Sequence, residues 1–266
     1  MEIQSVKLVY FSPTGTSKAI VHAISQGIGC NVVETIDITN SKIRKQELKL
    51  TEKDLLIFAV PVYMGRVPAL LNNFIQSIEA SNTPAVCVVV YGNREFDDAL
   101  LELRNLLTER GCVPIAGAAY LGEHSFSIKD YPIAEGRPNQ EDLDHAQGFG
   151  RIIAEKLQTI TNYSLMDTID IPGNMPYKEG TKLWDVDFIE VSDDCLQCGV
   201  CAEICPVEAI SFDNSRIIDI EKCITCCACI KSCPKSARSI KPSPVMDAAI
   251  RLNTNFSHPK DPELFV

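Results

Sequence analysis

The sequence lacks the features that would place the chain on nucleic acid or across a membrane. Lys and Arg number 25 against 35 Asp and Glu, and the resulting net charge of −10 repels phosphate backbones. The longest apolar runs, residues 55–63 and 85–91, are much shorter than the about 20 residues that a bilayer span needs. No basic segment followed by an apolar one opens the chain, which indicates no signal peptide. We therefore expect a soluble cytoplasmic protein that binds no nucleic acid.

Signatures of hydrolytic and nucleotide chemistry are also missing. The chain has no H-E-x-x-H metal site, no nucleophile elbow and no pair of catalytic carboxylates. It has neither the G-x-x-x-x-G-K-[ST] loop of nucleoside triphosphate sites nor the G-x-G-x-x-G dinucleotide fingerprint. Redox chemistry is the one class for which the sequence carries a signal, and that signal leaves open whether the protein is an enzyme.

Residues 1–162 have the pattern of an α/β domain. Five strands are expected where apolar residues run without interruption or where Val and Ile dominate, at residues 6–11, 31–38, 55–60, 85–91 and 113–121. Helical spacing alternates with them, at residues 17–28, 68–79, 97–110 and 142–161. This alternation predicts a doubly wound parallel sheet. The pattern resembles that of flavodoxin-like sheets, and this resemblance implies the strand order 2-1-3-4-5.

The rest of the chain divides into three parts. Residues 163–190 have no clear period and are punctuated by Pro and Gly, which predicts a linker, although Trp184 and Phe188 indicate that it packs on a neighbour. Residues 191–242 hold most of the cysteines and are expected to form a second, small domain. Residues 243–266 are a tail with a short helix expected near residues 245–252, and they carry no functional signal.

Nine of the twelve cysteines fall between residues 195 and 233, where they form an internal repeat. Each half reads C-x2-C-x2-C-x3-C-P, and the second copy follows the first after 28 residues. This run is the bacterial ferredoxin signature, in which the fourth cysteine ligates the other cluster. It predicts two [4Fe-4S] clusters, one on Cys195, Cys198, Cys201 and Cys233, the other on Cys223, Cys226, Cys229 and Cys205. A structural zinc site is the alternative, and Cys227 is expected to be a packed residue or a spare thiol.

A second motif, Ser12-Pro13-Thr14-Gly15-Thr16-Ser17, follows the first expected strand and opens a helix. A helix N-terminus offers free N–H groups to an anion, and a glycine lets the backbone approach it. The motif resembles the FMN-phosphate loop of flavodoxins, [ST]-x-T-G-x-[ST]. The resemblance implies that backbone N–H groups from Gly15 onward hold the FMN phosphate together with Ser12, Thr14, Thr16 and Ser17.

Two further loops follow expected strands and resemble the flavin-binding loops of flavodoxins. The first would lie beside the flavin and flip a peptide toward its N5 atom, and it contains Pro61, Val62, Tyr63, Met64 and Gly65. The second would contact the polar edge of the ring, and it contains Tyr91, Gly92, Asn93, Arg94 and Phe96. Tyr63 or Tyr91 would stack on a ring face. A cation at Arg66 or Arg94 would stabilise the anionic reduced flavin.

The order of the two domains resembles the flavodoxin–ferredoxin fusion family of anaerobic bacteria and archaea. This resemblance implies a flavodoxin-like sheet, an α+β ferredoxin-like domain, and electron transfer between FMN and two [4Fe-4S] clusters. Clusters move one electron at a time and flavin one or two, so the pair would act as a one-/two-electron carrier for redox proteins.

Two alternative functions remain open, and His124 is a candidate site residue for the first of them. The first alternative is an FMN-dependent reductase of a small organic acceptor, for which His124 is the candidate proton donor because histidine titrates near neutral pH. The second is an iron–sulfur sensor or interaction module. The physiological donor and acceptor are not encoded in the motifs, and an oligomer is possible.

Overall fold

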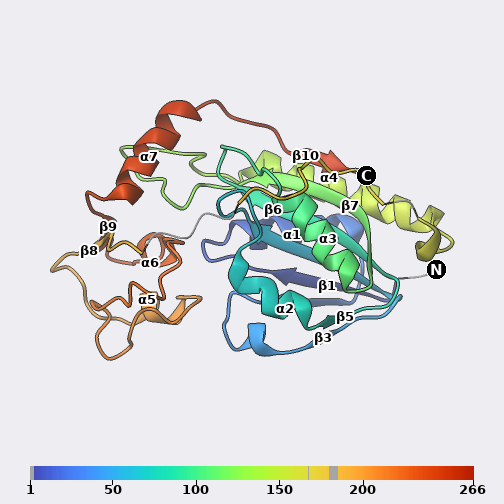
Figure 1. The fold of residues 1–266 in the computed structure, drawn as a ribbon, viewed down its shortest axis with the longest axis horizontal. Helices are drawn as coiled ribbons and strands as arrows, with labels where there is room; N and C mark the ends of the chain where they lie inside the picture. Colours follow the sequence, from blue (N-terminus) through green and yellow to red (C-terminus); the bar gives the residue numbers. More distant parts are fainter. Residues whose placement is uncertain (1–2, 167, 180–184) are drawn as a thin grey trace.

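The computed structural model describes residues 3–166, 168–179 and 185–266, which form a sheet domain and a smaller cysteine module side by side (Figure 1). We use these two names for residues 3–166 and 188–255. The elements of the sheet domain are β1 (Ser5–Tyr10), α1 (Thr16–Ile28), β2 (Val33–Asp37), η1 (Ile43–Lys45), β3 (Leu48–Lys49), β4 (Asp54–Pro61), η2 (Ala69–Leu71), α2 (Asn72–Gln76), β5 (Ile78–Glu79), β6 (Thr83–Tyr91), α3 (Ala99–Glu109), β7 (Cys112–Leu121), α4 (Gln140–Thr159) and η3 (Tyr163–Leu165). No helix of the described residues has the length and apolar character needed to cross a membrane.

The central sheet confirms the predicted topology and adds one strand to it. Its order is β10-β7-β6-β4-β1-β2, so the five expected strands are parallel and follow the order 2-1-3-4-5. The sixth strand, β10 (Glu263–Phe265), comes from the C-terminal tail and pairs antiparallel with β7. The flavodoxin-like fold predicted from the alternating pattern is therefore correct.

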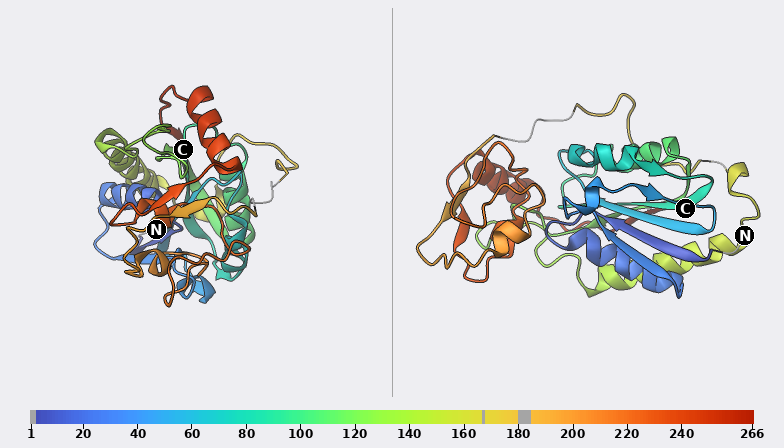
Figure 2. Two further views of the ribbon diagram at one scale, coloured as in Figure 1. Left: turned by 90° about the vertical axis from the view of Figure 1, so that its left-hand side faces the viewer. Right: turned by 90° about the horizontal axis from the view of Figure 1, so that it is seen from below.

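Helices cover both faces of this sheet, as Figure 2 shows. Successive residues of β1 point to opposite faces: Leu8 packs with the buried side of α1 and α4, and Val9 packs with the side covered by α2 and α3. All nine residues of β6 are buried, because this strand lies in the middle of the sheet between two covered faces. Two apolar cores therefore hold the ends of the strands in fixed positions.

The helix expected over residues 68–79 is shorter than predicted. Only η2 and α2 are helical, and residues 78–79 form β5, which pairs with β3. The apolar side chain of Ile78 satisfies a helical pattern and a strand pattern equally well, and its pairing with Leu48 decides for the strand.

The cysteine module is built around short elements. They are β8 (Ile189–Val191), α5 (Val200–Glu203), α6 (Ala228–Lys231), β9 (Arg238–Ile240) and α7 (Pro244–Asn255). Its small core includes Phe188, as the sequence indicated, and it takes up Phe126 and Ile133 from the segment that joins β7 to α4. Gly180 and Trp184 of the expected linker lie outside the described residues.

The tail joins the two parts of the molecule. Its expected helix is α7, which starts after Ser243, whose hydroxyl accepts a hydrogen bond from Met246 N–H at 3.4 Å. After α7 the chain crosses back over the sheet domain and ends its described course as β10 (Figure 1). The cysteine module is thus connected to the sheet at both of its ends.

Candidate functional site

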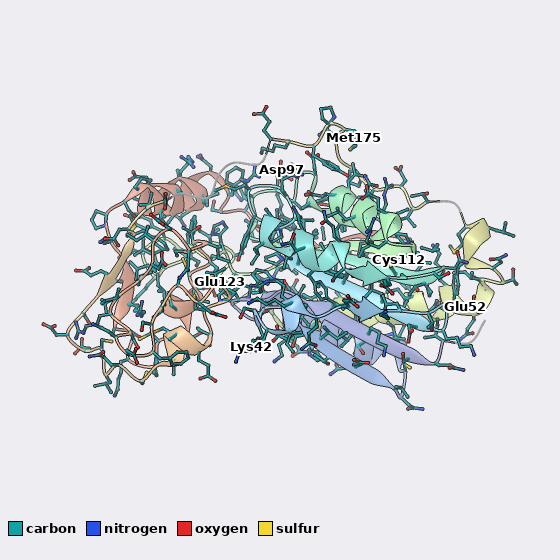
Figure 3. The ribbon with its side chains drawn as sticks, turned by 60° about the horizontal axis from the view of Figure 1, so that its bottom comes forward. Lys42, Glu52, Asp97, Cys112, Glu123 and Met175 are labelled. Carbon is teal, nitrogen blue, oxygen red and sulfur yellow. The ribbon has the colours of Figure 1, made fainter. Side chains whose placement is uncertain are left out.

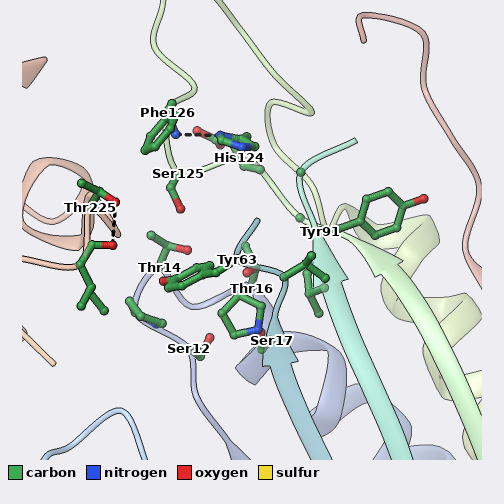
Figure 4. A pocket seen from close by; sticks show the side chains of 18 of the residues that line it. Ser12, Thr14, Thr16, Ser17, Tyr63, Tyr91, His124, Ser125, Phe126 and Thr225 are labelled. Carbon is green, nitrogen blue, oxygen red and sulfur yellow. Dashed lines mark hydrogen bonds between the residues drawn. The ribbon is translucent and has the colours of Figure 1, made fainter. Parts of the chain in front are cut away.

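A cavity lies at the carboxyl ends of β1, β4, β6 and β7, which is where ligands bind in open α/β sheets. We call it the loop cavity. Its volume, including the open mouth, is about 720 Å³, which lies within the range of small-molecule sites. It brings together ten of the predicted cofactor residues: Ser12, Thr14, Thr16, Ser17, Pro61, Val62, Tyr63, Met64, Tyr91 and Gly92 (Figure 4).

The first of its loops is shaped by Gly15. Gly15 has a φ of 87° and caps α1, and a Cβ atom at this position would meet nothing within 4 Å. Ser12 fixes the other end of the loop, since its Oγ accepts the Lys18 N–H at 3.0 Å and its N–H donates to Thr39 Oγ1 at 2.7 Å. The first turn of α1 therefore opens toward the cavity with backbone donors that the helix itself does not use.

Ser17 supplies the sharpest sign that this loop binds a ligand. Its side chain is fully buried and lines the loop cavity, yet its hydroxyl has no hydrogen-bond partner. A buried hydroxyl without a partner costs about 1–3 kcal/mol. A phosphate at the N-terminus of α1 would accept this hydrogen bond and those of the adjacent backbone N–H groups. The loop residues thus fit the phosphate that the sequence predicted.

The second loop is a tight turn across residues 63–66. Tyr63 N–H donates to Arg66 O and Arg66 N–H donates to Tyr63 O, both at 3.0 Å. The two central residues, Met64 and Gly65, have φ values of 55° and 83°, the combination found in type I′ turns. Gly65 also has no room for a side chain, because its Cβ would lie 2.4 Å from Asp97 Oδ2.

The two candidate stacking residues have different surroundings. The ring of Tyr63 lies among the labelled side chains of the loop cavity, beside Thr14 (Figure 4). Tyr91 points away from it and packs edge-on against Phe96, with 5.6 Å between the ring centroids. Of the two, Tyr63 is therefore the one positioned to stack on a ligand.

Three other candidates of the 91–97 loop do not line the loop cavity. Asn93 is buried and its Nδ2 donates to Phe256 O at 2.6 Å and to His258 O at 2.8 Å, so its side chain holds the tail. Phe96 packs in the core between Tyr91 and β10. Arg94 pairs with Asp97 and, with Gly65, lines a neighbouring cavity described below.

Arg66 is also committed elsewhere. Its guanidinium makes a two-point ion pair with Glu102, at 2.8 and 2.6 Å, and lies 4.8 Å from the centre of the Tyr177 ring. It does not line either cavity. A cation beside the candidate flavin site is therefore available from Arg94 and not from Arg66.

His124 is partly buried beside the loop cavity. Burial, together with the nearby charges of Lys231 and Arg94, lowers its pKa to about 4. Its Nδ1 accepts the Phe126 N–H at 3.0 Å, so the proton of the neutral ring sits on Nε2. At neutral pH this ring is therefore uncharged and presents Nε2–H as its donor.

The cysteines of the repeat gather in two pockets. The outer cysteine pocket, of about 320 Å³, is lined by Cys195, Cys198, Cys201 and Cys233. The inner cysteine pocket, of about 360 Å³, is lined by Cys205, Cys223, Cys226 and Cys229, with Cys227 beside them. Each pocket thus takes three cysteines from one run and the fourth from the other. Among the described residues no group of three or more His, Cys, Asp or Glu is arranged for a single metal ion.

The backbone repeats as faithfully as the sequence. Gln197 and Thr225, Glu208 and Ser236, and Gly199 and Cys227 are pairs 28 residues apart, and all six have φ values between 50° and 80°. Ala209 N–H and Ala237 N–H donate to Cys205 Sγ and Cys233 Sγ, each at 3.3 Å. Cys227 occupies the left-handed position that glycine holds in the first copy, which explains its place in the motif without making it a ligand.

The inner cysteine pocket lies directly against the loop cavity. Ile224 lines both of them, and Thr225 completes the wall of the loop cavity opposite His124 (Figure 4). Burial raises the pKa of Tyr63 well above its usual value, and the neighbouring thiols of Cys226, Cys227 and Cys223 raise it further. Tyr63 therefore stands between the two sites.

Ion pairs and hydrogen bonds fix this junction. Lys231 pairs with Glu123 and donates to Ser127 O at 2.7 Å, and Arg44 Nη2 donates to Pro206 O at 2.6 Å. Figure 3 shows Glu123 at the boundary between the two units. The sequence analysis did not identify Ile224 or Lys231 as part of the site. In the sequence, Ile224 and Lys231 are marked only by their positions next to or between the cysteines of the repeat. These positions do not indicate that the two side chains face the sheet domain.

Comparisons with known proteins agree with this division. Residues 7–110 match the family model of a flavodoxin domain, and residues 188–240 match that of a 4Fe-4S dicluster domain. No curated protein sequence matches the chain.

Three solved structures illustrate the similarity of the sheet domain. A flavodoxin from the domain Archaea is 18% identical, with 58% of this chain and 99% of that chain covered and a TM-score of 0.42. A Fusobacterium nucleatum flavodoxin bound to flavin mononucleotide is 15% identical, with coverages of 58% and 99% and a TM-score of 0.38. Rubredoxin oxygen:oxidoreductase from Desulfovibrio gigas is 13% identical, with coverages of 59% and 37% and a TM-score of 0.39.

The two family models identify the cofactor classes as well as the domains. A flavodoxin domain implies FMN, and a 4Fe-4S domain implies an iron–sulfur cluster in place of the zinc alternative. The loop cavity and the cysteine pockets are positioned to hold such groups. The chain is therefore a flavodoxin–ferredoxin fusion, an FMN and iron–sulfur electron-transfer protein.

Proposed function

We propose that the protein carries electrons between two [4Fe-4S] clusters and FMN and so converts one-electron into two-electron transfer for partner redox proteins. Clusters exchange single electrons, whereas a flavin exchanges one or two. The order we propose is outer pocket, inner pocket, loop cavity. The observation that carries it is the shared wall at Ile224, which separates the inner cysteine pocket from the loop cavity.

The residues that would hold FMN come from three loops. Ser17 Oγ and the backbone N–H groups after Gly15 would donate to its phosphate, with Ser12, Thr14 and Thr16 around it. Tyr63 would stack on the ring, and the 61–65 turn and the backbone at Tyr91 and Gly92 would line its edges. Tyr63 would then contact the flavin in a cavity whose wall also includes Ile224 and Thr225 of the cysteine module.

The two cysteine pockets would hold one cluster each. Cys195, Cys198, Cys201 and Cys233 would ligate the outer cluster, and Cys205, Cys223, Cys226 and Cys229 the inner one. The outer pocket is the one open to a partner, because Cys198 is exposed and its neighbour Leu196 is 68% exposed. Partner proteins would therefore exchange electrons at the outer pocket.

The test is the cofactor content of the full chain after anaerobic purification. We expect about eight irons, about eight sulfides and about one FMN per chain, as two cubane clusters and one flavin require. About four irons would refute the two-cluster assignment, and bound zinc would refute the clusters altogether. Absence of flavin would refute the electron-carrier function and leave an iron–sulfur sensor or interaction module.

The order of the relay needs a kinetic test. Reduced methyl viologen serves as a one-electron donor, and stopped-flow absorbance follows the clusters and the flavin separately. We expect the clusters to be reduced before the flavin in the wild type. Flavin reduction that precedes cluster reduction, or that keeps its rate when Cys226→Ser removes the inner cluster, contradicts the proposed order.

A second function is favoured by one observation. A further cavity adjoins the loop cavity, so a small organic acceptor has room beside the flavin. The protein would then be an FMN-dependent reductase fed by the clusters.

A further inference from the structure

The further cavity, which we call the side cavity, opens beside the loop cavity at the junction of the two units. Its volume, including the open mouth, is about 840 Å³. The two cavities share six lining residues: Val62, Met64, Tyr91, Gly92, His124 and Phe126. The remaining linings differ: the phosphate loop lines only the loop cavity, and α7 lines only the side cavity, so each cavity offers its own binding groups.

The wall contributed by the cysteine module is apolar with a single cation. Ala248 and Leu252 of α7 are buried and line the side cavity, and Arg251 lies between them at its exposed rim. Within the described part of the chain, Arg251 has no ion pair and no side-chain hydrogen bond. A guanidinium that faces a cavity without an acid partner is a binding group for an anion.

Two further cations line the cavity, one from the sheet domain and one from the segment that links the two units. Arg94 and Lys178 line the side cavity, and both pair with the one carboxylate of Asp97. The acid that lines the cavity, Glu95, is engaged by Lys260 at 2.5 Å. The cations around the cavity therefore outnumber the acids, in a chain whose net charge is −10. A local excess of positive charge attracts small anions into such a cavity.

We propose that the side cavity binds a small organic carboxylate with an apolar body, held next to the flavin between the two units. Arg251 and Arg94 would bind the carboxylate from opposite walls, and Phe126, Ala248 and Leu252 would contact the apolar part. The proposal rests on the proposed function, since it needs FMN in the loop cavity. It identifies the acceptor of the reductase alternative by class: a hydrophobic carboxylate rather than a sugar, an amine or a metal ion.

The test is a titration of the FMN-loaded full chain with benzoate, with benzyl alcohol as the neutral probe of similar shape. A ligand beside the flavin changes its visible absorbance, so binding is read without turnover. We expect a saturable change with benzoate and none with benzyl alcohol at the same concentrations. Arg251→Ala should weaken benzoate binding about tenfold, the effect of losing one charge-assisted hydrogen bond.

Arg151→Ala is the matched control, because Arg151 is an exposed arginine on α4, outside both cavities. It should bind benzoate as the wild type does. Flavin content is measured first, so a chain without FMN overturns both proposals, whereas a flavin-loaded chain that ignores benzoate overturns only this one. Equal responses to benzoate and benzyl alcohol, or equal losses in Arg251→Ala and Arg151→Ala, would also overturn it.

Discussion

The sheet domain and the cysteine module form their sites in opposite ways. The sheet domain surrounds the loop cavity with loops that two large apolar cores hold in position. The module has one small core, which borrows Phe126 and Ile133 from the other unit, and its pockets are formed by cysteines on tight turns. A segment of this size cannot bury enough apolar surface to fold strongly without its metal.

This difference shows that a cofactor can bind to a site that is already folded, or can be required for the site to fold. The sheet domain should keep its fold when FMN is absent, while the module should lose its fold when both clusters are absent and become less stable when one is absent. Four predictions test this comparison.

Removal of one cluster ligand should have the largest effect. Cys226→Ser should lose about four irons per chain and make the module easier to cleave by protease while FMN stays bound, because only the module depends on its metal for folding. Iron analysis, flavin analysis and limited proteolysis measure the three outcomes. Cys227→Gly is the control: it removes a thiol from the same pocket, restores the residue type found at Gly199, and should keep about eight irons. Loss of FMN together with the iron in Cys226→Ser would show that the FMN site also depends on the clusters, which contradicts the comparison.

The next effect concerns the connection between the two units. Asn93→Ala removes two hydrogen bonds to the carbonyls of Phe256 and His258 and one from Lys260 N–H. We expect a loss of about 3 kcal/mol in the free energy of unfolding, from three buried hydrogen bonds at about 1 kcal/mol each, with FMN affinity nearly unchanged. Asn253→Ala removes one exposed hydrogen bond, to Pro132 O, and should cost less than about 1 kcal/mol. Denaturant unfolding of the loaded protein measures both. A larger change in FMN affinity than in stability would show that Asn93 binds the flavin, as the sequence analysis expected.

A pH effect should follow from His124. Burial lowers the pKa of this side chain from 6.5 to about 4. Between these values the unfolded chain binds a proton that the folded chain does not, so the stabilisation is complete above pH 6.5 and is lost as the pH falls toward 4. We expect about 2 kcal/mol, reduced by solvent at the open cavity. The loss from pH 6.5 to pH 5 should be smaller in His124→Gln than in the wild type and unchanged in His258→Gln, whose histidine is exposed.

The smallest expected effect is a gain in the stability of the FMN-free protein together with a loss of FMN affinity. Ser17→Ala removes a buried hydroxyl without a partner, so the FMN-free sheet domain should gain up to about 1 kcal/mol in stability. FMN should bind about tenfold more weakly, since its phosphate loses one hydrogen bond. Ser25→Ala, on the same helix away from the cavity, should leave FMN affinity as it is. A stability loss in flavin-free Ser17→Ala would show that this hydroxyl serves the fold.

Local patterns predicted most of this molecule. The five apolar runs separated by helices predict the strands of a doubly wound sheet, and the cysteine spacings of three residues predict the two cysteine turns. The strand order came from the resemblance to flavodoxins, and the exchange of the fourth cysteine came from the ferredoxin signature. Both signals are short-range, because neighbouring residues decide whether a segment is a buried strand or a cysteine turn.

The features that the sequence did not predict depend on contacts with residues far away in the chain. β10 is three residues long and has no period of its own, so only its pairing with β7 makes it a strand. Asn93 has a typical loop sequence on both sides, and its role is decided by a tail more than 160 residues away. The same holds for Ile224, whose place beside the loop cavity results from the docking of the two units.

The return of the chain to the sheet through β10 has a consequence for engineering. A ferredoxin unit joined to its neighbour by one flexible connection can rotate, but here the unit is inserted between α4 of the sheet domain and β10, an edge strand of its sheet. Two attachment points restrict it to a narrow set of orientations. A chimaera that exchanges ferredoxin units must therefore keep residues 256–265 as part of the flavodoxin half. Without them, the orientation of the transplanted unit relative to the flavin site would not be fixed.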